Sequence, residues 1–171
     1  MMKVFALIFV LFLPPYVSGD SVIIVNKSSH ELVLYQHGIQ QFSAPAAVGK
    51  TEDLTPEGRF QVLVKAKDPY YRKKDIPGGD SRNPLGSRWI GFDARGTDGR
   101  VYGIHGTNQP ESIGKSVSAG CIRLKNEDVQ ALFDLIPMGA DVFIVNDSST
   151  MEETYEKWEK QRLHKFLNSA P

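Results

Sequence analysis

The sequence predicts a mainly β domain with one internal helix and a C-terminal amphipathic helix. Three short runs rich in β-branched and aromatic residues, separated by turn-forming segments, favour an antiparallel meander. These runs lie at 21–26, 31–36 and 39–44. Apolar and polar residues then alternate over 59–65, which indicates a half-buried strand. Two later segments, 126–136 and 148–168, carry apolar residues at helical spacing instead.

A long irregular segment follows the alternating strand. Residues 68–88 are rich in Pro, Gly, Asp and charge and show no periodicity. A loop of this length in a compact domain is usually a functional lid or disordered. We favour a substrate-facing lid, because Tyr70 and its neighbouring tyrosine offer groups for binding. Residues 89–105 are then expected to form a hairpin around a two-residue turn at Asp98-Gly99.

The two helices have recognisable start signals. Asn126 is expected to cap the internal helix, and Pro137 to end it before a strand at 140–145. The apolar stripe of this helix comprises Val129, Leu132, Phe133 and Ile136. In the tail helix, Ser149 and Glu152 fit a capping box. The stripe there comprises Met151, Tyr155, Trp158, Phe166 and Leu167. We expect the tail stripe to pack on the domain, with membrane or partner docking as the alternative.

The N-terminus has the order of a secretory signal peptide. Lys3 precedes the apolar run 4–13, and paired prolines and a small-residue end follow. The run is too short for a transmembrane helix, which needs about 20 residues. We expect a signal peptide over 1–19, an exported domain over 20–148 and a helical tail over 149–171. A buried N-terminal strand is the alternative. The expected location is the cell wall, the periplasm or the extracellular space.

Charge and composition exclude several classes of function. Removal of the expected signal peptide leaves 152 residues with 19 basic and 20 acidic side chains. Such balance argues against nucleic-acid binding, which needs clustered positive charge, and gives no attraction to anionic membranes. We expect no stable membrane span. The sequence shows no internal repeat, metal-ligand cluster or phosphate-binding glycine loop, so no metal or cofactor is expected.

The single cysteine directs attention to a possible reaction centre. Cys121 cannot form an intramolecular disulfide, so it is a dimer link, a buried small hydrophobe or a reactive group. It lies 16 positions after His105, and the pair falls at a strand end and just before a helix. An imidazole can take the proton of a thiol if a third group holds its tautomer. Gly120 would let a carbonyl approach, and the N–H groups of Gly120 and Cys121 are candidates for an oxyanion hole.

A structural interpretation of the same residues remains open. The thiol could be buried, and the imidazole could merely bond a carbonyl. The other three histidines fall in turns or on the tail helix and are expected at the surface. They are His30, His37 and His164.

The region around these two residues resembles the L,D-transpeptidase catalytic domain, the YkuD-type family of peptidoglycan cross-linking enzymes. The matching motifs are His105-Gly106-Thr107 and Ser118-Ala119-Gly120-Cys121-Ile122-Arg123. Upstream, Thr55, Pro56, Gly58 and Phe60 match a Thr-Pro-x-Gly-x-Phe segment, and "MGADVFIV" resembles the closing strand. The resemblance spans about residues 21–146. Many members have His where this chain has Ala119, which leaves His105 as the base.

The resemblance implies a β-sandwich or barrel-like fold and a cysteine-dependent acyl transfer. Cys121 would attack a peptidoglycan tetrapeptide stem, His105 would move the proton, and the Gly106 carbonyl would orient the imidazole. Release of D-alanine and capture by an amine would give a 3→3 cross-link. Hydrolysis of the same thioester would give an L,D-carboxypeptidase. A non-catalytic cell-wall-binding domain and a secreted cysteine peptidase are two competing interpretations.

The remaining site residues are expected to contact substrate. Arg123 would bind a carboxylate or brace the loop, with pairing to a nearby Asp or Glu as the alternative. Ser118 would stabilise the turn or donate to substrate. Gly120, Thr107 and Tyr70 complete the expected set. The partners implied are donor and acceptor stem peptides, with carbapenem-like β-lactams as inhibitors.

Overall fold

The computed structural model describes residues 21–169. The predicted signal peptide lies outside these residues. One curled sheet of eight strands has the order β3-β2-β1-β10-β5-β6-β7-β9, and β4 and β8 pair separately. The strands are β1 (Ser21–Asn26), β2 (Glu31–Gln36), β3 (Ile39–Pro45), β4 (Val48–Gly49), β5 (Gly58–Lys67), β6 (Arg88–Phe92), β7 (Tyr102–His105), β8 (Ser116–Ser118), β9 (Ile122–Arg123) and β10 (Asp141–Val145). The helices are α1 (Asn126–Leu135) and α2 (Met151–Ser169), with 3-10 turns η1 (Arg72–Lys74), η2 (Ala94–Gly96) and η3 (Pro110–Ser112).

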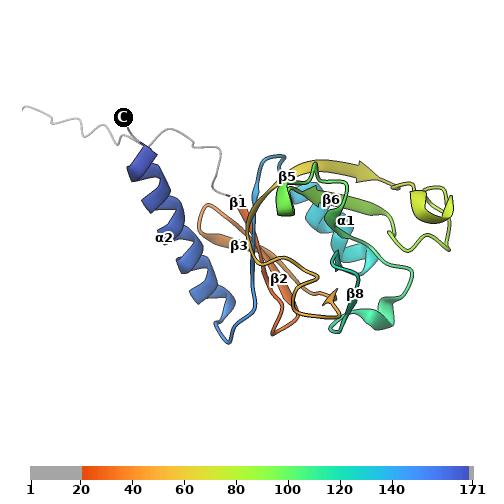
Figure 1. The fold of residues 1–171 in the computed structure, drawn as a ribbon, viewed down its shortest axis with the longest axis horizontal. Coiled ribbons are helices and arrows are strands. Elements are labelled where there is room, and N and C mark those ends of the chain that lie inside the picture. Colours follow the sequence, from red (N-terminus) through yellow and green to blue (C-terminus); the bar gives the residue numbers. More distant parts are fainter. Residues whose placement is uncertain (1–20, 170–171) are drawn as a thin grey trace, which may run out of the picture.

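The predicted meander is confirmed, and its central strands are buried on both faces. β1 pairs with β2 in antiparallel register and with β10 in parallel register. Ile23 and Val25 face the main core, whereas Val22 and Ile24 face a second cluster beneath α2. Figure 1 shows α2 on the outer side of β1 and β2, away from the rest of the domain. This two-sided burial explains why β1 is an unbroken apolar run rather than an alternating one.

The hairpin of β6 and β7 is confirmed, but the predicted two-residue turn is wrong. Phe92 pairs with Tyr102, so the connection runs from 93 to 101 and contains η2. Ala94 is fully buried in the core. The chain leaves the ladder directly after Phe92 and forms η2, so Gly99 falls in a longer loop.

The internal helix α1 fills the space enclosed by the curled sheet. Its predicted stripe is confirmed, because the four apolar side chains all belong to the main core. The predicted cap is wrong by one position. Lys125 occupies the N-cap position without a side-chain cap bond, and Asn126 is the first helical residue. The Asn126 amide bonds to other loops instead.

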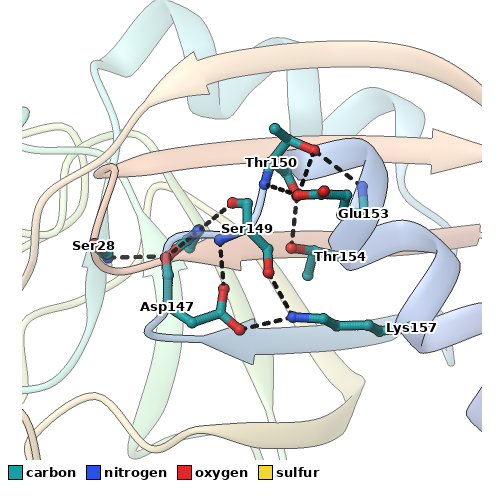
Figure 2. A network of polar contacts seen from close by, with 8 residues as sticks. Ser28, Asp147, Ser149, Thr150, Glu153, Thr154 and Lys157 are labelled. Carbon is teal, nitrogen blue, oxygen red and sulfur yellow. Dashed lines mark hydrogen bonds and ion pairs between the residues drawn. The ribbon is translucent and has the colours of Figure 1, made fainter.

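The start of α2 is set by a network that Figure 2 shows from close by. Thr150 and Glu153 form the capping box, because the Glu153 N–H donates to Thr150 Oγ1 at 3.2 Å and the Thr150 N–H donates to Glu153 Oε2 at 2.8 Å. The predicted Ser149–Glu152 box is therefore shifted by one residue. Buried Asn26 holds the preceding linker, since its Nδ2 donates to the Ser149 carbonyl at 3.0 Å.

The tail helix packs apolar side chains of its first half on the domain. Met151, Tyr155 and Trp158 contact the second cluster, and the Tyr155 ring stacks on Tyr35 with centroids 4.5 Å apart. The later apolar residues are exposed, including Leu167 at 71%. The predicted packing of the stripe thus holds for its N-terminal part. Within residues 21–169, no helix is long and apolar enough to cross a membrane.

The position of the α2 cap is testable by paired substitutions. We expect T150A to lower the free energy of unfolding by about 1 kcal/mol, because it removes the side-chain cap of α2. S149A, at the position that the sequence pattern favoured, should cost clearly less. Urea denaturation of both variants checks this. Equal losses, or a larger loss for S149A, would contradict the observed cap.

Candidate active site

Three neighbouring strands bury one face and present the other to the site. β7 pairs with β9 in parallel register, with Ile104 beside Ile122 and His105 beside Arg123. Both isoleucines are fully buried in the main core. Because successive side chains of a strand point to opposite faces, His105 and Arg123 project from the face away from the core. The site therefore lies on the outer side of β6, β7 and β9.

Cys121 enters this face from the turn that precedes β9. The β7–β9 register, continued by one residue, places Cys121 beside Gly103 and on the same face as His105. The thiol donates to the Val101 carbonyl at 3.5 Å. The residue keeps an intermediate exposure. Burial of the thiol raises its pKa above the ordinary value of 9.0, and a backbone bond from Gly103 and the charge of Lys73 oppose this only in part.

His105 is held by the backbone carbonyl of Gly106. Its Nδ1 lies 2.6 Å from the Gly106 carbonyl oxygen, and the backbone of Leu85 also acts on the imidazole. The side chain is only 4% exposed. Burial lowers the pKa of His105 to about 4, and the nearby charge of Arg123 acts in the same direction.

These shifts define the resting state of the pair. At neutral pH the imidazole is neutral and the thiol is protonated. Since Nδ1 donates to the Gly106 carbonyl, Nε2 carries the free lone pair and can accept a proton. Among the described residues, no group of three or more His, Cys, Asp or Glu side chains is arranged to hold a metal ion.

The turn before Cys121 is braced by Ser118. Buried Ser118 donates through Oγ to the Cys121 carbonyl at 2.6 Å and accepts from the Gly120 N–H at 3.0 Å. Of the two predicted roles of Ser118, the structure therefore supports stabilisation of the turn. The Gly120 amide is used within the turn, which corrects its expected place in an oxyanion hole. Gly120 has φ +129°, and a Cβ there would lie 2.5 Å from the Leu54 carbonyl oxygen, so its bare Cα serves this backbone approach rather than substrate access.

Thr55 fixes the same turn from outside. Its Oγ1 donates to the Gly120 carbonyl at 3.0 Å and accepts from the Gly49 N–H at 2.8 Å. The residue is fully buried, and the Lys27 ammonium donates to its carbonyl at 3.2 Å. The sequence pattern included Thr55 but gave it no role. A hydroxyl just before a Pro-x-Gly turn is the only local signal that could have marked it.

Asn126 joins the two loops that meet at His105. Its Oδ1 accepts from the Ser87 N–H at 3.1 Å, and its Nδ2 donates to the Thr107 carbonyl at 3.1 Å. A Cβ on either Gly86 or Gly106 would overlap Oδ1. Asn126 therefore positions the backbone on both sides of the imidazole, a role that its place at a helix start concealed.

The other predicted substrate residues have different surroundings. Thr107 is buried, and its Oγ1 accepts from the Gln109 N–H at 3.0 Å within its own loop, so its expected contact with substrate is not open in this conformation. Arg123 donates through Nη1 to the Gln109 amide oxygen at 3.5 Å. Within residues 21–169 no carboxylate pairs with Arg123, so the alternative of a structural ion pair is wrong. Tyr70 is half exposed, and its hydroxyl donates to Asp75 of the same loop.

The loop 68–88 is ordered and faces the site. Buried Asn83 organises it, since Nδ2 donates to the Pro69 and Pro77 carbonyls at 2.8 and 3.1 Å. The Asn108 amide ties it to the loop after β7 by donating to the Arg82 carbonyl at 3.1 Å. The backbone of Leu85 in this loop acts on the His105 imidazole, and Lys73 acts on the Cys121 thiol. This placement agrees with the predicted lid.

Comparison with known proteins identifies the family. Residues 20–144 match the sequence model of YkuD, the L,D-transpeptidase catalytic domain. YqjB of Bacillus subtilis, named as an L,D-transpeptidase, is 57% identical over 135 residues, which are 79% of this chain and 77% of that protein. YkuD of Bacillus licheniformis, named likewise, is 38% identical over 71% of this chain and 64% of its own length.

Solved structures show the same fold. L,D-transpeptidase 3 of Mycobacterium tuberculosis with a faropenem-derived adduct superposes with a TM-score of 0.59 at 21% identity, over 74% of this chain and 60% of that one. The avibactam carbamoyl enzyme of Ldtfm gives 0.58 at 26% identity, over 75% of this chain and 49% of that one. LdtMt1 in complex with imipenem gives a TM-score of 0.58 at 22% identity, over 74% of this chain and 59% of that one. With its fold and most of its length matched, the chain belongs to the YkuD family of L,D-transpeptidase catalytic domains.

Proposed function

We propose that this protein is a peptidoglycan L,D-transpeptidase in which Cys121 forms a thioester with a tetrapeptide stem. The observation that carries the proposal is the pair on the outer face of β7 and β9. A thiol lies in the strand position next to Gly103, and an imidazole on the same face has its tautomer fixed by the Gly106 carbonyl at 2.6 Å. Nucleophile, base and orienting group are the three parts that thiol acyl transfer needs.

The reaction proceeds from the neutral pair. Sγ attacks the carbonyl carbon of the third stem residue while the thiol proton passes to Nε2 of His105. The C–N bond to D-alanine then breaks, and His105 delivers the proton to the departing amine. The Cys121 N–H is the candidate oxyanion donor, because the Gly120 N–H is already bonded.

The second half-reaction regenerates the thiol. An amine of a neighbouring stem attacks the thioester carbonyl, His105 takes its proton, and Sγ leaves as the new amide forms a 3→3 cross-link. Arg123 has no carboxylate partner among the described residues and is the candidate for binding a substrate carboxylate, and Tyr70 on the lid is a second candidate for substrate contact. Since the substrate is peptidoglycan, we expect the protein to act outside the cytoplasm.

β-lactams of the carbapenem type should acylate the same thiol. Two of the solved relatives are described with a faropenem-derived adduct and with imipenem. A strained lactam carbonyl replaces the stem amide in the attack by Cys121, and no leaving amine departs.

The acyl-enzyme is the first prediction of this mechanism. When the protein is mixed with a disaccharide-tetrapeptide, intact-mass spectrometry should show an adduct of the tripeptide acyl group together with free D-alanine. C121A should give neither product, because the nucleophile is missing. H105Q should form the adduct at least about 100-fold more slowly, because general-base help is lost.

Product analysis with an added amine acceptor then separates the possible outcomes. Cross-linked dimer supports transpeptidation, and tripeptide alone would instead show hydrolysis. A folded wild-type protein that gives no adduct with several stem chemistries would contradict the enzyme function and leave a wall-binding domain.

The shifted pKa values predict a distinctive pH dependence. Alkylation of Cys121 by iodoacetamide should rise about tenfold per pH unit between about pH 6 and 9, because the pKa of the thiol lies above 9.0. Acylation by stem peptide should instead persist at neutral pH and fall only as the pH drops through about 4, where His105 becomes protonated.

H105Q provides the control for the alkylation profile. Since the resting imidazole is neutral, its removal should leave the pH dependence of alkylation nearly unchanged while acylation is lost. Alkylation that levels off below pH 7 in the wild type would show a thiolate–imidazolium pair and refute the neutral resting state.

A further inference from the structure

A tryptophan lies flat against the proposed base. Trp89 on β6 is the register partner of His105 on β7, and directly opposite residues of an antiparallel ladder share a face. The two rings are nearly parallel, at 15°, with centroids 5.6 Å apart. The indole Nε1 donates to the Gly99 carbonyl at 2.9 Å, which fixes the plane of the ring.

Two glycines make room for the indole. Gly91 and Gly103 are register partners on β6 and β7. A Cβ on Gly103 would lie 2.6 Å from Cζ2 of Trp89, and a Cβ on Gly91 would lie 2.6 Å from its Nε1. The ring therefore covers the backbone of Gly103, the residue whose backbone bonds the Cys121 thiol. Trp89 thus lies against the imidazole of His105 and against the backbone position beside Cys121.

This burial is not that of a core residue. Trp89 is only 9% exposed, yet it belongs to neither hydrophobic cluster, because it projects from the face opposite the core. Trp158, the other tryptophan, lies within the second cluster beneath α2.

We propose that Trp89 is a positioning residue of the acyl transfer, holding the imidazole of His105 flat so that Nδ1 stays on the Gly106 carbonyl and Nε2 stays on the thiol side. The catalytic part of this inference rests on the proposed function. The contact between the two rings does not, and it can be measured without substrate.

Trp89 also shields the base from water. The charged group that acts on the His105 imidazole is Arg123 on β9, whereas Lys73 of the lid acts on the Cys121 thiol, which lies on the same face as His105. The lid otherwise presents the backbone of Leu85, and α1 presents the neutral Asn126 amide. Burial can lower a histidine pKa by up to about 3–5 pH units. Attraction between the imidazolium and the indole ring raises the pKa by only about one unit. Loss of the ring should therefore raise the pKa of His105.

Fluorescence tests the contact directly. W158F leaves Trp89 as the sole tryptophan. An imidazolium against an indole quenches its emission far more than a neutral imidazole does. The emission of W158F should therefore fall with a midpoint near pH 4, and this step should vanish in W158F/H105Q. Emission that stays constant in W158F from about pH 3 to 8, with circular dichroism unchanged, would overturn the proposal.

Kinetics test the positioning role, with W158F as the matched control. W89L should lower kcat about tenfold or more with less change in KM. It should also raise the acidic pKa in the pH profile of kcat/KM by about one pH unit or more. W89F keeps an aromatic ring and should retain the acidic pKa of kcat/KM that the wild type shows. A folded W89L with the wild-type kcat and the wild-type acidic pKa of kcat/KM would refute the role. If W89L does not fold, W89F decides: an acidic pKa that moves fully to about 6.5 in W89F would refute the role as well. A fluorescence step near pH 4 without turnover by any variant would instead count against the proposed function alone.

Discussion

The parallel pairing of β7 with β9 sets the geometry on which the site depends. Only two residue pairs form it, and the two pairs face opposite ways: Ile104 and Ile122 enter the core, while His105 and Arg123 face outward. A parallel pair needs a crossover of about a dozen residues or more. The 16 residues from 106 to 121 between β7 and β9 satisfy this requirement, so the spacing of the motif is consistent with the topology of the sheet.

The two ends of the sheet use their second face differently. β1, β2 and β10 are covered outside by α2, so those strands contribute stability on both sides. β6 and β7 leave the outer face to Trp89, His105 and two glycines. The lid and the Asn126 amide then close this face around the imidazole. Burial keeps the His105 imidazole neutral, so it can act as a base. Burial also keeps the Cys121 thiol protonated, so the thiol is a poor nucleophile until its proton is removed.

Sequence patterns identified the parts governed by local periodicity and failed where long-range contacts decide. The first three strands and the stripe of α1 follow from hydrophobic spacing alone. Both predicted helix caps were displaced by one residue, because the amide of Asn126 has partners 19 and 39 positions away and because Asn26 fixes the linker before Thr150. Cys121 and His105 have a chemical signature, so the sequence proposed them as site residues, and the structure places them on one face of the sheet. Thr55 and Asn126 act through backbone groups of distant loops, which no spacing in the sequence reveals.

The central claim is that the site holds a neutral imidazole whose Nδ1 proton is committed to the Gly106 carbonyl. Nitrogen-15 NMR of histidine-labelled protein tests it most directly, with H105Q used to assign the signal. We expect the Nδ1–H tautomer of His105 throughout the neutral range, with protonation only near pH 4. An imidazolium at pH 7, or the Nε2–H tautomer, would contradict it.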